Sequence, residues 1–271
     1  MSNLVVRALT GSLFVSLIIG ALWLGQTSAI LIISLFLFLG LIEYINLFKE
    51  NKIIQISKPL SISFILFIYI LLIGISFGNI PEHFSALIFP IIFILFLTEL
   101  WRKKENPLLN IGVMSFSIFY LVIPFYLMIA INSKSDHDNP LAIGMFLLIW
   151  TNDTFAYLSG RFFGKTKLFE RISPKKTWEG TFGGILVTIL VAFLIHLWTP
   201  NYSLNFWIIS ACIIAPCSIF GDLLESVFKR SLNIKDSGNI LPGHGGILDR
   251  FDAAIFVVPF FYCWLTFYTY F

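Results

Sequence analysis

The sequence predicts an all-α polytopic membrane protein with about nine transmembrane helices. Hydrophobic residues make up 58% of the 271 residues and charged residues only 12%, whereas soluble domains carry about a quarter charged residues. The apolar residues occur in continuous runs such as 30–41, not in the alternation of a membrane β-barrel strand. So few Lys and Arg residues also exclude a nucleic-acid-binding module. We therefore expect one membrane domain over residues 1–271.

The amino-terminal part, residues 1–139, holds about five apolar segments. Each is close to the roughly 20 residues that a spanning helix needs, and polar or Pro/Gly residues separate them. The first follows Arg7 and precedes a poor cleavage site, so we expect a retained span and not a signal peptide. The expected spans are 5–24, 29–48, 59–77, 84–101 and 111–131.

The carboxyl-terminal part, residues 140–271, alternates apolar segments with longer polar ones. Residues 160–179 and 225–252 are too long and too polar to be simple connectors. We expect this part to hold the catalytic spans and loops. Its expected spans are 140–159, 180–198, 204–224 and 253–271.

The distribution of basic residues predicts the orientation. With nine spans, all of the 18 Lys and Arg residues except Lys134 fall on one side, and cytoplasmic segments carry such an excess. We therefore expect a cytoplasmic amino terminus, a carboxyl terminus on the opposite side, and a multi-pass protein of a bacterial-type cytoplasmic (inner) membrane. The candidate active site then lies on the cytoplasmic side.

Acidic residues near helix ends predict a metal site. Asp249 and Asp252 are three residues apart at the start of the last span, which places both on one helix face. Such a pair needs a compensating charge, and Mg²⁺ prefers carboxylates, water and phosphates as ligands, although helix capping by Asp249 is an alternative. Asp222 and Glu225 close the eighth span with the same spacing. Asp153 lies inside the sixth span, where an ionisable side chain indicates function.

Two further acids, Glu43 and Glu99, lie one turn from helix ends. For these we expect interfacial snorkelling or a local salt bridge, with Lys49 and Arg102 as the nearby basic residues.

The segment 226–252 combines glycines with basic residues. Glycines let the backbone approach phosphate oxygens closely, although a plain turn also uses them. Basic side chains bind phosphates, although snorkelling at the interface is an alternative. A histidine acts as a proton donor, contacts a phosphate, or makes only a structural hydrogen bond. The candidates for substrate contact are Lys229, Arg230, Lys235, His244, Gly245 and Gly246.

A second basic cluster precedes the seventh span. Pro174 is typical of the first turn of a short helix, and Ser173 of its cap. That helix start would present free N–H groups beside Lys175 and Lys176, which is a phosphate-binding arrangement. The alternative is a simple positively charged flank.

These two segments resemble the phosphatidate cytidylyltransferase family, also called CDP-diacylglycerol synthases. The upstream segment is similar to the family's second block from Asp153 through Gly160-Arg161 to the run 173–180. Before Trp150 only the multi-span character matches. The signature-like residues are Ser226, Lys229-Arg230, Lys235-Asp236, Gly238, Pro242, His244-Gly245-Gly246, Asp249-Arg250 and Asp252.

The resemblance implies the reaction CTP + phosphatidate → CDP-diacylglycerol + pyrophosphate in phospholipid biosynthesis. It implies metal binding by Asp222 and Asp249 first, with Asp252 and Asp153 as weaker candidates, and a Mg²⁺ cofactor with room for a second cation. The expected partners are CTP, phosphatidate and membrane lipids, with no nucleic acid, and a homodimer is one option for assembly. The expected catalytic residues are Asp222, Asp249, Lys235 and Arg230, and the expected substrate-binding residues are Ser173, Lys175, Lys176, Lys229, His244, Gly245 and Gly246.

Two other functions stay open at this point. A polyprenol kinase-like enzyme would use CTP but transfer the γ-phosphate. An ion-coupled transporter would use the intramembrane acids as an ion path, but it predicts inverted repeats, which the sequence does not display.

Overall fold

The computed structural model describes residues 3–49, 51–135, 140–199, 201–238, 240–241, 243 and 245–270. Helices dominate this part of the chain, and one antiparallel hairpin of two strands interrupts them. In chain order the elements are α1 (Asn3–Trp23), α2 (Gln26–Asn46), α3 (Lys58–Ser76), η1 (Glu82–Leu87), α4 (Ile88–Arg102), α5 (Pro107–Ser117), η2 (Ile118–Val122), α6 (Ile123–Asn132), α7 (Leu141–Phe163), β1 (Lys167–Phe169), β2 (Ser173–Thr177), α8 (Trp178–Trp198), α9 (Leu204–Ser231) and α10 (Leu248–Tyr270).

The helices confirm an all-α polytopic membrane protein. In the described residues, eight helical segments are long and apolar enough to cross a membrane, and α1 adds the shorter apolar stretch Ala8–Trp23. Each expected span corresponds to one of them. The segments α5, η2 and α6 form a single span, whose π-helical turn η2 precedes Pro124, a residue without an N–H donor. The main difference is α9, which continues to Ser231 where the sequence predicted an end near 224.

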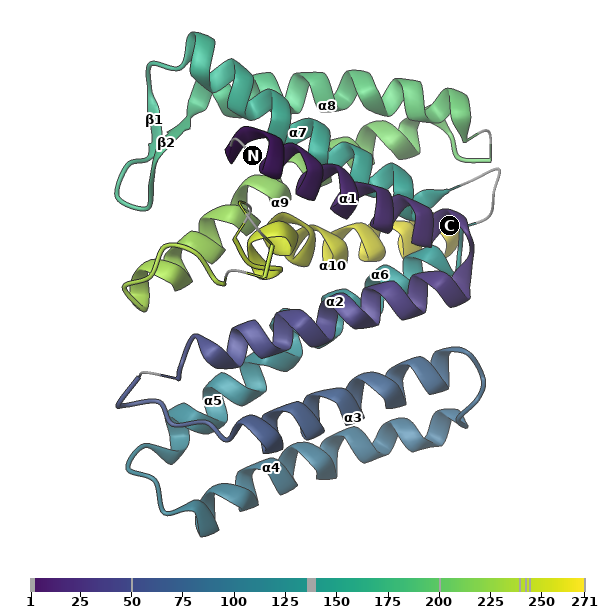
Figure 1. Cartoon of the computed structure of the whole chain (residues 1–271). Helices are drawn as coiled ribbons and strands as arrows, with labels where there is room; N and C mark the ends of the chain where they lie inside the picture. The colour runs from purple at the N-terminus through teal and green to yellow at the C-terminus, as the bar shows by residue number, and fades with distance from the viewer. Residues whose placement is uncertain are drawn as a thin grey trace.

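The helices lie side by side, with α10 in the middle of the bundle (Figure 1). It packs against α9, α6, α7 and α2. Helices α3 and α4 form one edge of the bundle and α8 the other. The amino-terminal helices therefore contact the last one directly, which brings residues far apart in sequence to one place.

Aromatic packing holds the first turn of α10. The buried ring of Phe251 contacts four aromatic rings from α1, α2, α6 and α7 at centroid distances of 5.0–6.5 Å. Each such pair contributes about 0.5–1.5 kcal/mol beyond its buried area. Because Phe251 lies between Asp249 and Asp252 in the chain, this cluster fixes the position of the backbone that carries both aspartates. The four partner rings are Phe14, Phe36, Phe125 and Phe146.

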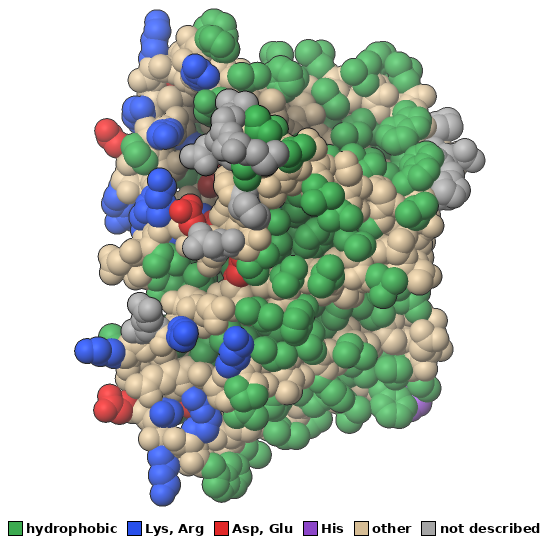
Figure 2. All heavy atoms as spheres, viewed as in Figure 1, with side chains coloured by type: hydrophobic (Ala, Val, Ile, Leu, Met, Phe, Trp, Pro, Cys, Tyr) green, Lys and Arg blue, Asp and Glu red, His purple; other side chains and the backbone are tan. Residues whose placement is uncertain are grey.

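Basic residues gather at one end of the bundle, and hydrophobic side chains cover its flank (Figure 2). We call this end, which carries the β1–β2 hairpin and the start of α10, the basic end. Lys134 lies away from it, with its ammonium 5.3 Å from the centroid of the Tyr262 ring. This arrangement is the one that the charge distribution of the sequence predicts for the two sides of a membrane.

Candidate active site at the basic end

A polar cavity of about 620 Å³ opens at the basic end between α7, the hairpin, α8, α9 and α10. Its volume is within the range of about 300–1,000 Å³ that is usual for small-molecule sites. It brings together predicted site residues from four separate stretches of sequence. These are Asp153, Ser173, Lys175, Lys176, Asp222, Asp249 and Asp252.

Helix α7 contributes one stripe of the cavity wall. Asp153, Tyr157 and Arg161 recur every four residues and so lie on one helix face. The hydroxyl of Ser218 on α9 donates to Asp153 Oδ1 at 2.6 Å, which orients the carboxylate. The side-chain amide of Asn152 is buried beside it. The four-residue spacing is the signal that could have identified Arg161 from the sequence.

The hairpin corrects the prediction for Ser173. The segment Ser173–Thr177 is strand β2, paired antiparallel with β1, and it contains no short helix. The helix starts later, at Trp178, and its cap is Thr177, whose Oγ1 accepts the N–H of Gly180 at 3.2 Å. The Glu179 carboxylate accepts two backbone N–H groups from the other end of the hairpin at 3.0 and 3.1 Å. This contact, between residues 13 and 14 positions apart, holds the segment as a hairpin.

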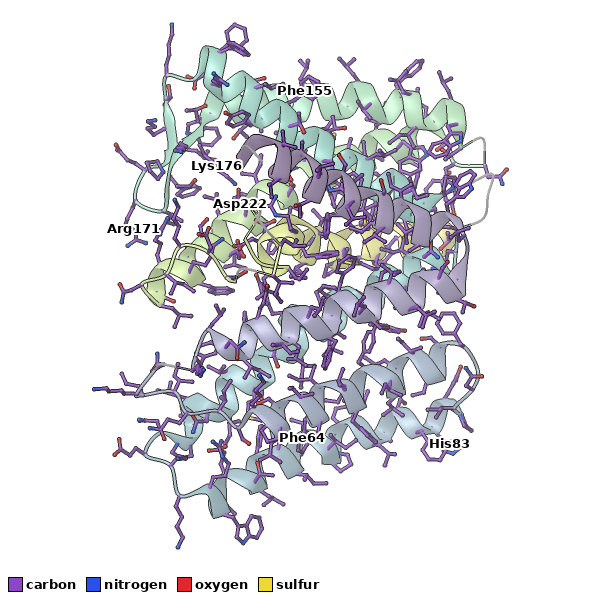
Figure 3. All side chains as sticks on the ribbon, in the orientation of Figure 1. Phe64, His83, Phe155, Arg171, Lys176 and Asp222 are labelled. Carbon is purple, nitrogen blue, oxygen red and sulfur yellow. The ribbon has the colours of Figure 1, made fainter. Side chains whose placement is uncertain are left out.

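Lys176 lies on β2 and reaches across the cavity to α9. Its ammonium is 2.7 Å from Asp222 Oδ2 and also donates to the Ile219 carbonyl at 3.2 Å. Figure 3 labels Lys176 and Asp222 beside each other near the hairpin, with His83 at the opposite end of the molecule. Half-exposed Asp222 thus lines the cavity with a neutralising cation already in contact.

Asp249 holds the loop before α10 and also lines the cavity. Its Oδ2 accepts the N–H of Gly246 at 2.8 Å and of Ser237 at 3.0 Å, and its Oδ1 lies 2.6 Å from the ammonium of Lys229. Lys229 also contacts Glu225 at 2.6 Å. Both N–H groups precede α10, in which Asp249 is the second residue, so these bonds hold the preceding loop and the capping alternative for Asp249 is wrong. Its place in the cavity wall keeps it available to a ligand.

Glu43 corrects the prediction of snorkelling. Its carboxylate is buried, and its Oε2 accepts the N–H of Leu248 at 3.0 Å, so a residue of α2 caps α10 from 205 positions away. The positive end of the helix dipole stabilises such a carboxylate. Sequence spacing gives no signal for a contact of this range.

Three glycines of the 237–246 loop fit around these carboxylates. A Cβ on Gly238 would lie 2.6 Å from Glu43 Oε1, and one on Gly246 would lie 2.5 Å from Glu43 Oε2. Gly245 has a φ of +82°, and its Cβ would lie 2.5 Å from Asp249 Oδ2. At these positions the absence of a side chain lets the loop backbone approach the carboxylates of Glu43 and Asp249 closely.

The other buried acid of the amino-terminal half follows its prediction. Glu99 forms a local salt bridge with Arg102, and its second oxygen accepts from the Asn110 amide at 3.1 Å.

The remaining predicted residues lie outside the cavity wall. Lys229 lies behind it, bonded to Asp249 and Glu225. Arg230 is exposed and donates to the Ile234 carbonyl at 3.3 Å, and Lys235 is exposed in the following loop. Because α9 continues past the cavity to Ser231, these two side chains are carried beyond it. His244 lies outside the described residues.

The acidic side chains that the structure describes in the cavity offer the carboxylate oxygens that Mg²⁺ prefers as ligands, but they do not surround a single ion position. Within the described residues, no three His, Cys, Asp or Glu side chains are grouped to hold one ion. Mg²⁺ is usually bound through one or two carboxylates, with water and substrate phosphates completing its shell. The carboxylate wall therefore suits a cation that arrives with a nucleotide.

Comparison with known proteins gives matches over most of the chain. The profile of the cytidylyltransferase family matches residues 5–268. A protein named phosphatidate cytidylyltransferase from Staphylococcus haemolyticus is 35% identical over 257 residues, which is 94% of this chain and 96% of that protein. A protein of the same name from Staphylococcus epidermidis is 52% identical over 117 residues, 42% of this chain and 44% of that protein. One from Haemophilus influenzae is 38% identical over 172 residues, 60% and 58% of the two chains.

Proposed function

The chain belongs to the cytidylyltransferase family, and from this premise we propose that it transfers the cytidylyl group of CTP to phosphatidate. The products are CDP-diacylglycerol and pyrophosphate, and the chain is a multi-pass enzyme of phospholipid biosynthesis. The observation that carries this proposal is the cavity in which four aspartates and several basic side chains meet at the end of a membrane bundle. A cavity at the end of a membrane bundle is accessible to a nucleotide from the aqueous side and to a lipid headgroup from the bilayer.

The reaction joins two anions. A phosphate oxygen of phosphatidate attacks the α-phosphorus of CTP, a new P–O bond forms, and the bond from the α-phosphorus to the bridging oxygen breaks as pyrophosphate leaves. The attacking oxygen is already ionised, so the main requirements are alignment and neutralisation of charge. Basic side chains of the cavity wall supply that neutralisation: Arg161, Lys167, Lys175, Lys176 and Arg250.

Lys176 has a specific part in this proposal. In the structure it neutralises Asp222. When a nucleotide enters, its phosphates offer the ammonium a second anionic partner in the same cavity. Lys176 then shifts toward a phosphate oxygen, and Asp222 becomes free to accept a cation.

Asp222 and Asp249 would hold Mg²⁺, with Asp252 and Asp153 on the same wall as further donors. The bound ion would supply neutralisation of phosphate charge. The carboxylate chemistry and the shared cavity support this assignment, and a second cation has the same donors available.

We also propose that the basic end faces the cytoplasm of a bacterial cell, in the inner membrane. The positive-inside rule supports this orientation, and CTP is then available at the cavity mouth. Phosphatidate would come from the adjoining leaflet.

The test uses the purified full-length chain in detergent with phosphatidate, Mg²⁺ and CTP labelled at either the α- or the γ-phosphate. We expect the α-label in the lipid and release of pyrophosphate. A lipid that carries the γ-label would instead identify a kinase, and no label in the lipid would reject both enzymes.

The matched variants are Asp222→Asn and Glu82→Gln. The first removes a cavity carboxylate without changing side-chain size, and we expect a loss of at least about a hundredfold in turnover, as for other electrostatic groups of active sites. The second removes an exposed acid of η1 and should retain full turnover.

A further inference from the structure

A second cavity system lies across α9 from the candidate active site. Its apolar part is a groove of about 380 Å³ between α2, α5 and α9. We call it the chain groove, and its lining shares no residue with the active-site cavity. The walls are mostly aliphatic and aromatic, which suits a hydrocarbon chain. They include Leu47, Phe48, Leu109, Phe116, Phe228 and Leu232.

The chain groove adjoins a cavity of opposite character at the basic end. This cavity of about 490 Å³ is lined by three lysines, Lys49, Lys58 and Lys104, and no acidic residue appears in its described lining. We call it the lysine pocket. It shares Phe48 and Ile54 with the chain groove, so the two cavities meet.

We propose that this pair of cavities binds an anionic phospholipid, with its phosphate headgroup in the lysine pocket and an acyl chain in the chain groove. The combined cavity is basic at the lysine pocket and apolar along the chain groove. An anionic phospholipid has the matching order, a charged phosphate followed by an apolar acyl chain. The positive-inside rule accounts for lysines at this end, but it does not account for a cavity that three of them line or for the apolar groove joined to it.

The chain groove also has an unused hydrogen-bond donor. The hydroxyl of Tyr120, on η2, is buried in the groove wall and has no partner within the described residues. Buried polar groups are normally satisfied, and an ester carbonyl of a glycerolipid would accept this bond.

The bound lipid would lie behind the active site and outside it. The far side of the groove is formed by Glu225 and Lys229, and Lys229 holds Asp249 at 2.6 Å. An occupant therefore packs against the ion pair that positions one cavity aspartate. This places the lipid next to the active site, in a cavity that shares no lining residue with it.

Native mass spectrometry of the delipidated full-length chain in neutral detergent tests the proposal. Phosphatidylglycerol is the anionic probe, phosphatidylcholine the zwitterionic one, and glycerol 3-phosphate the free headgroup. We expect phosphatidylglycerol to bind at least about tenfold more tightly than either of the others, because each nearby lysine contributes roughly fivefold. Equal retention of both lipids would overturn the proposal, and competition by glycerol 3-phosphate at the same concentration would show that a free anion is the ligand.

Changing all three pocket lysines to Gln should weaken phosphatidylglycerol binding at least about tenfold. The matched control removes the same charge from the same end but outside both cavities. If the two triple variants bind the lipid equally, general surface charge explains the attraction and the lysine pocket is not a site. The control residues are Lys52, Lys103 and Arg171, also changed to Gln.

Gly112→Leu tests the groove. Gly112 lines it, and a Cβ at this position would meet no atom within 4 Å, so a leucine side chain starts in open space beside the groove. Gly20→Leu on α1 is the control, since its Cβ also has open space. We expect only Gly112→Leu to weaken binding, and unchanged binding by it would reject the groove. Because binding is detected by mass, the result is independent of whether the chain transfers a cytidylyl group.

Discussion

The contact between Glu43 and the start of α10 provides the sharpest test of how the site is built. The carboxylate accepts the N–H of Leu248 and fills the space that Gly238 and Gly246 leave open. The same loop supplies two N–H groups that hold Asp249. Removing Glu43 should therefore displace a cavity aspartate that Glu43 does not touch.

The magnitude depends on what replaces the carboxylate. Glu43→Ala loses a hydrogen bond to a charged acceptor, worth about 1.5–3 kcal/mol, and a favourable helix-dipole interaction of about 0.3–1 kcal/mol. Glu43→Gln keeps a carbonyl acceptor and the side-chain volume, so we expect it to lose about half as much free energy as Glu43→Ala. If the loss appears in the transition state, about 1.4 kcal/mol corresponds to a tenfold decrease in kcat.

The assay measures kcat and KM for CTP, together with thermal unfolding in detergent. We expect kcat to fall at least about tenfold in Glu43→Ala and less in Glu43→Gln. Glu99→Ala is the matched control, because Glu99 is a buried acid of the same half with its own partners, Arg102 and Asn110. It should lower thermal stability and leave kcat unchanged. Equal kcat losses in the two alanine variants would refute a positioning role for Glu43 and indicate general destabilisation.

Three further substitutions test the packing around the site. Gly144→Ala places a Cβ 2.4 Å from the buried ring of Trp207, so thermal unfolding in detergent should show a loss of about 1–3 kcal/mol, and Gly112→Ala, with open space, should show none. Lys229→Met leaves two carboxylates without their shared cation; we expect a loss of about 3–5 kcal/mol, and a fully stable variant would contradict the buried ion pairs. Glu179→Ala removes the acceptor of two backbone N–H groups, so proteolysis should cleave the hairpin faster than in the unchanged chain.

The spans and their order could be predicted from the sequence because apolar runs and basic flanks are local features. The approximate position of the cavity aspartates could also be predicted from the sequence. Asp153, Asp222 and Asp252 each lie in the half of a different helix that is nearer to the basic end, so the alternation of the spans brings them toward that end before any contact is known. The resemblance of 226–252 to a family signature added the chemistry, and the family comparison agrees with it.

Other parts of the site depend on contacts that cross the chain. Ser173 and Pro174 have the composition of a helix start, but Glu179 bonds to the opposite end of the segment and a strand forms instead. Arg230 misses the cavity because α9 does not stop where its apolar run does. The position of Glu43 near a helix end predicts an interfacial residue, whereas its partner is in the last helix, 205 positions away. Local propensity cannot report tertiary contacts of this kind.

The cap that α2 provides for α10 also bears on biogenesis. Spans enter the bilayer in the order of their synthesis, so Glu43 is in place long before the N–H group that it accepts. Until the last span arrives, the nascent protein carries a carboxylate close to lipid without its intended donor, a state that membranes disfavour. A chain interrupted before residue 248 would keep that defect permanently. The contact thus makes the amino-terminal part of the bundle depend on completion of the chain, because it is Leu248 that supplies this donor to Glu43.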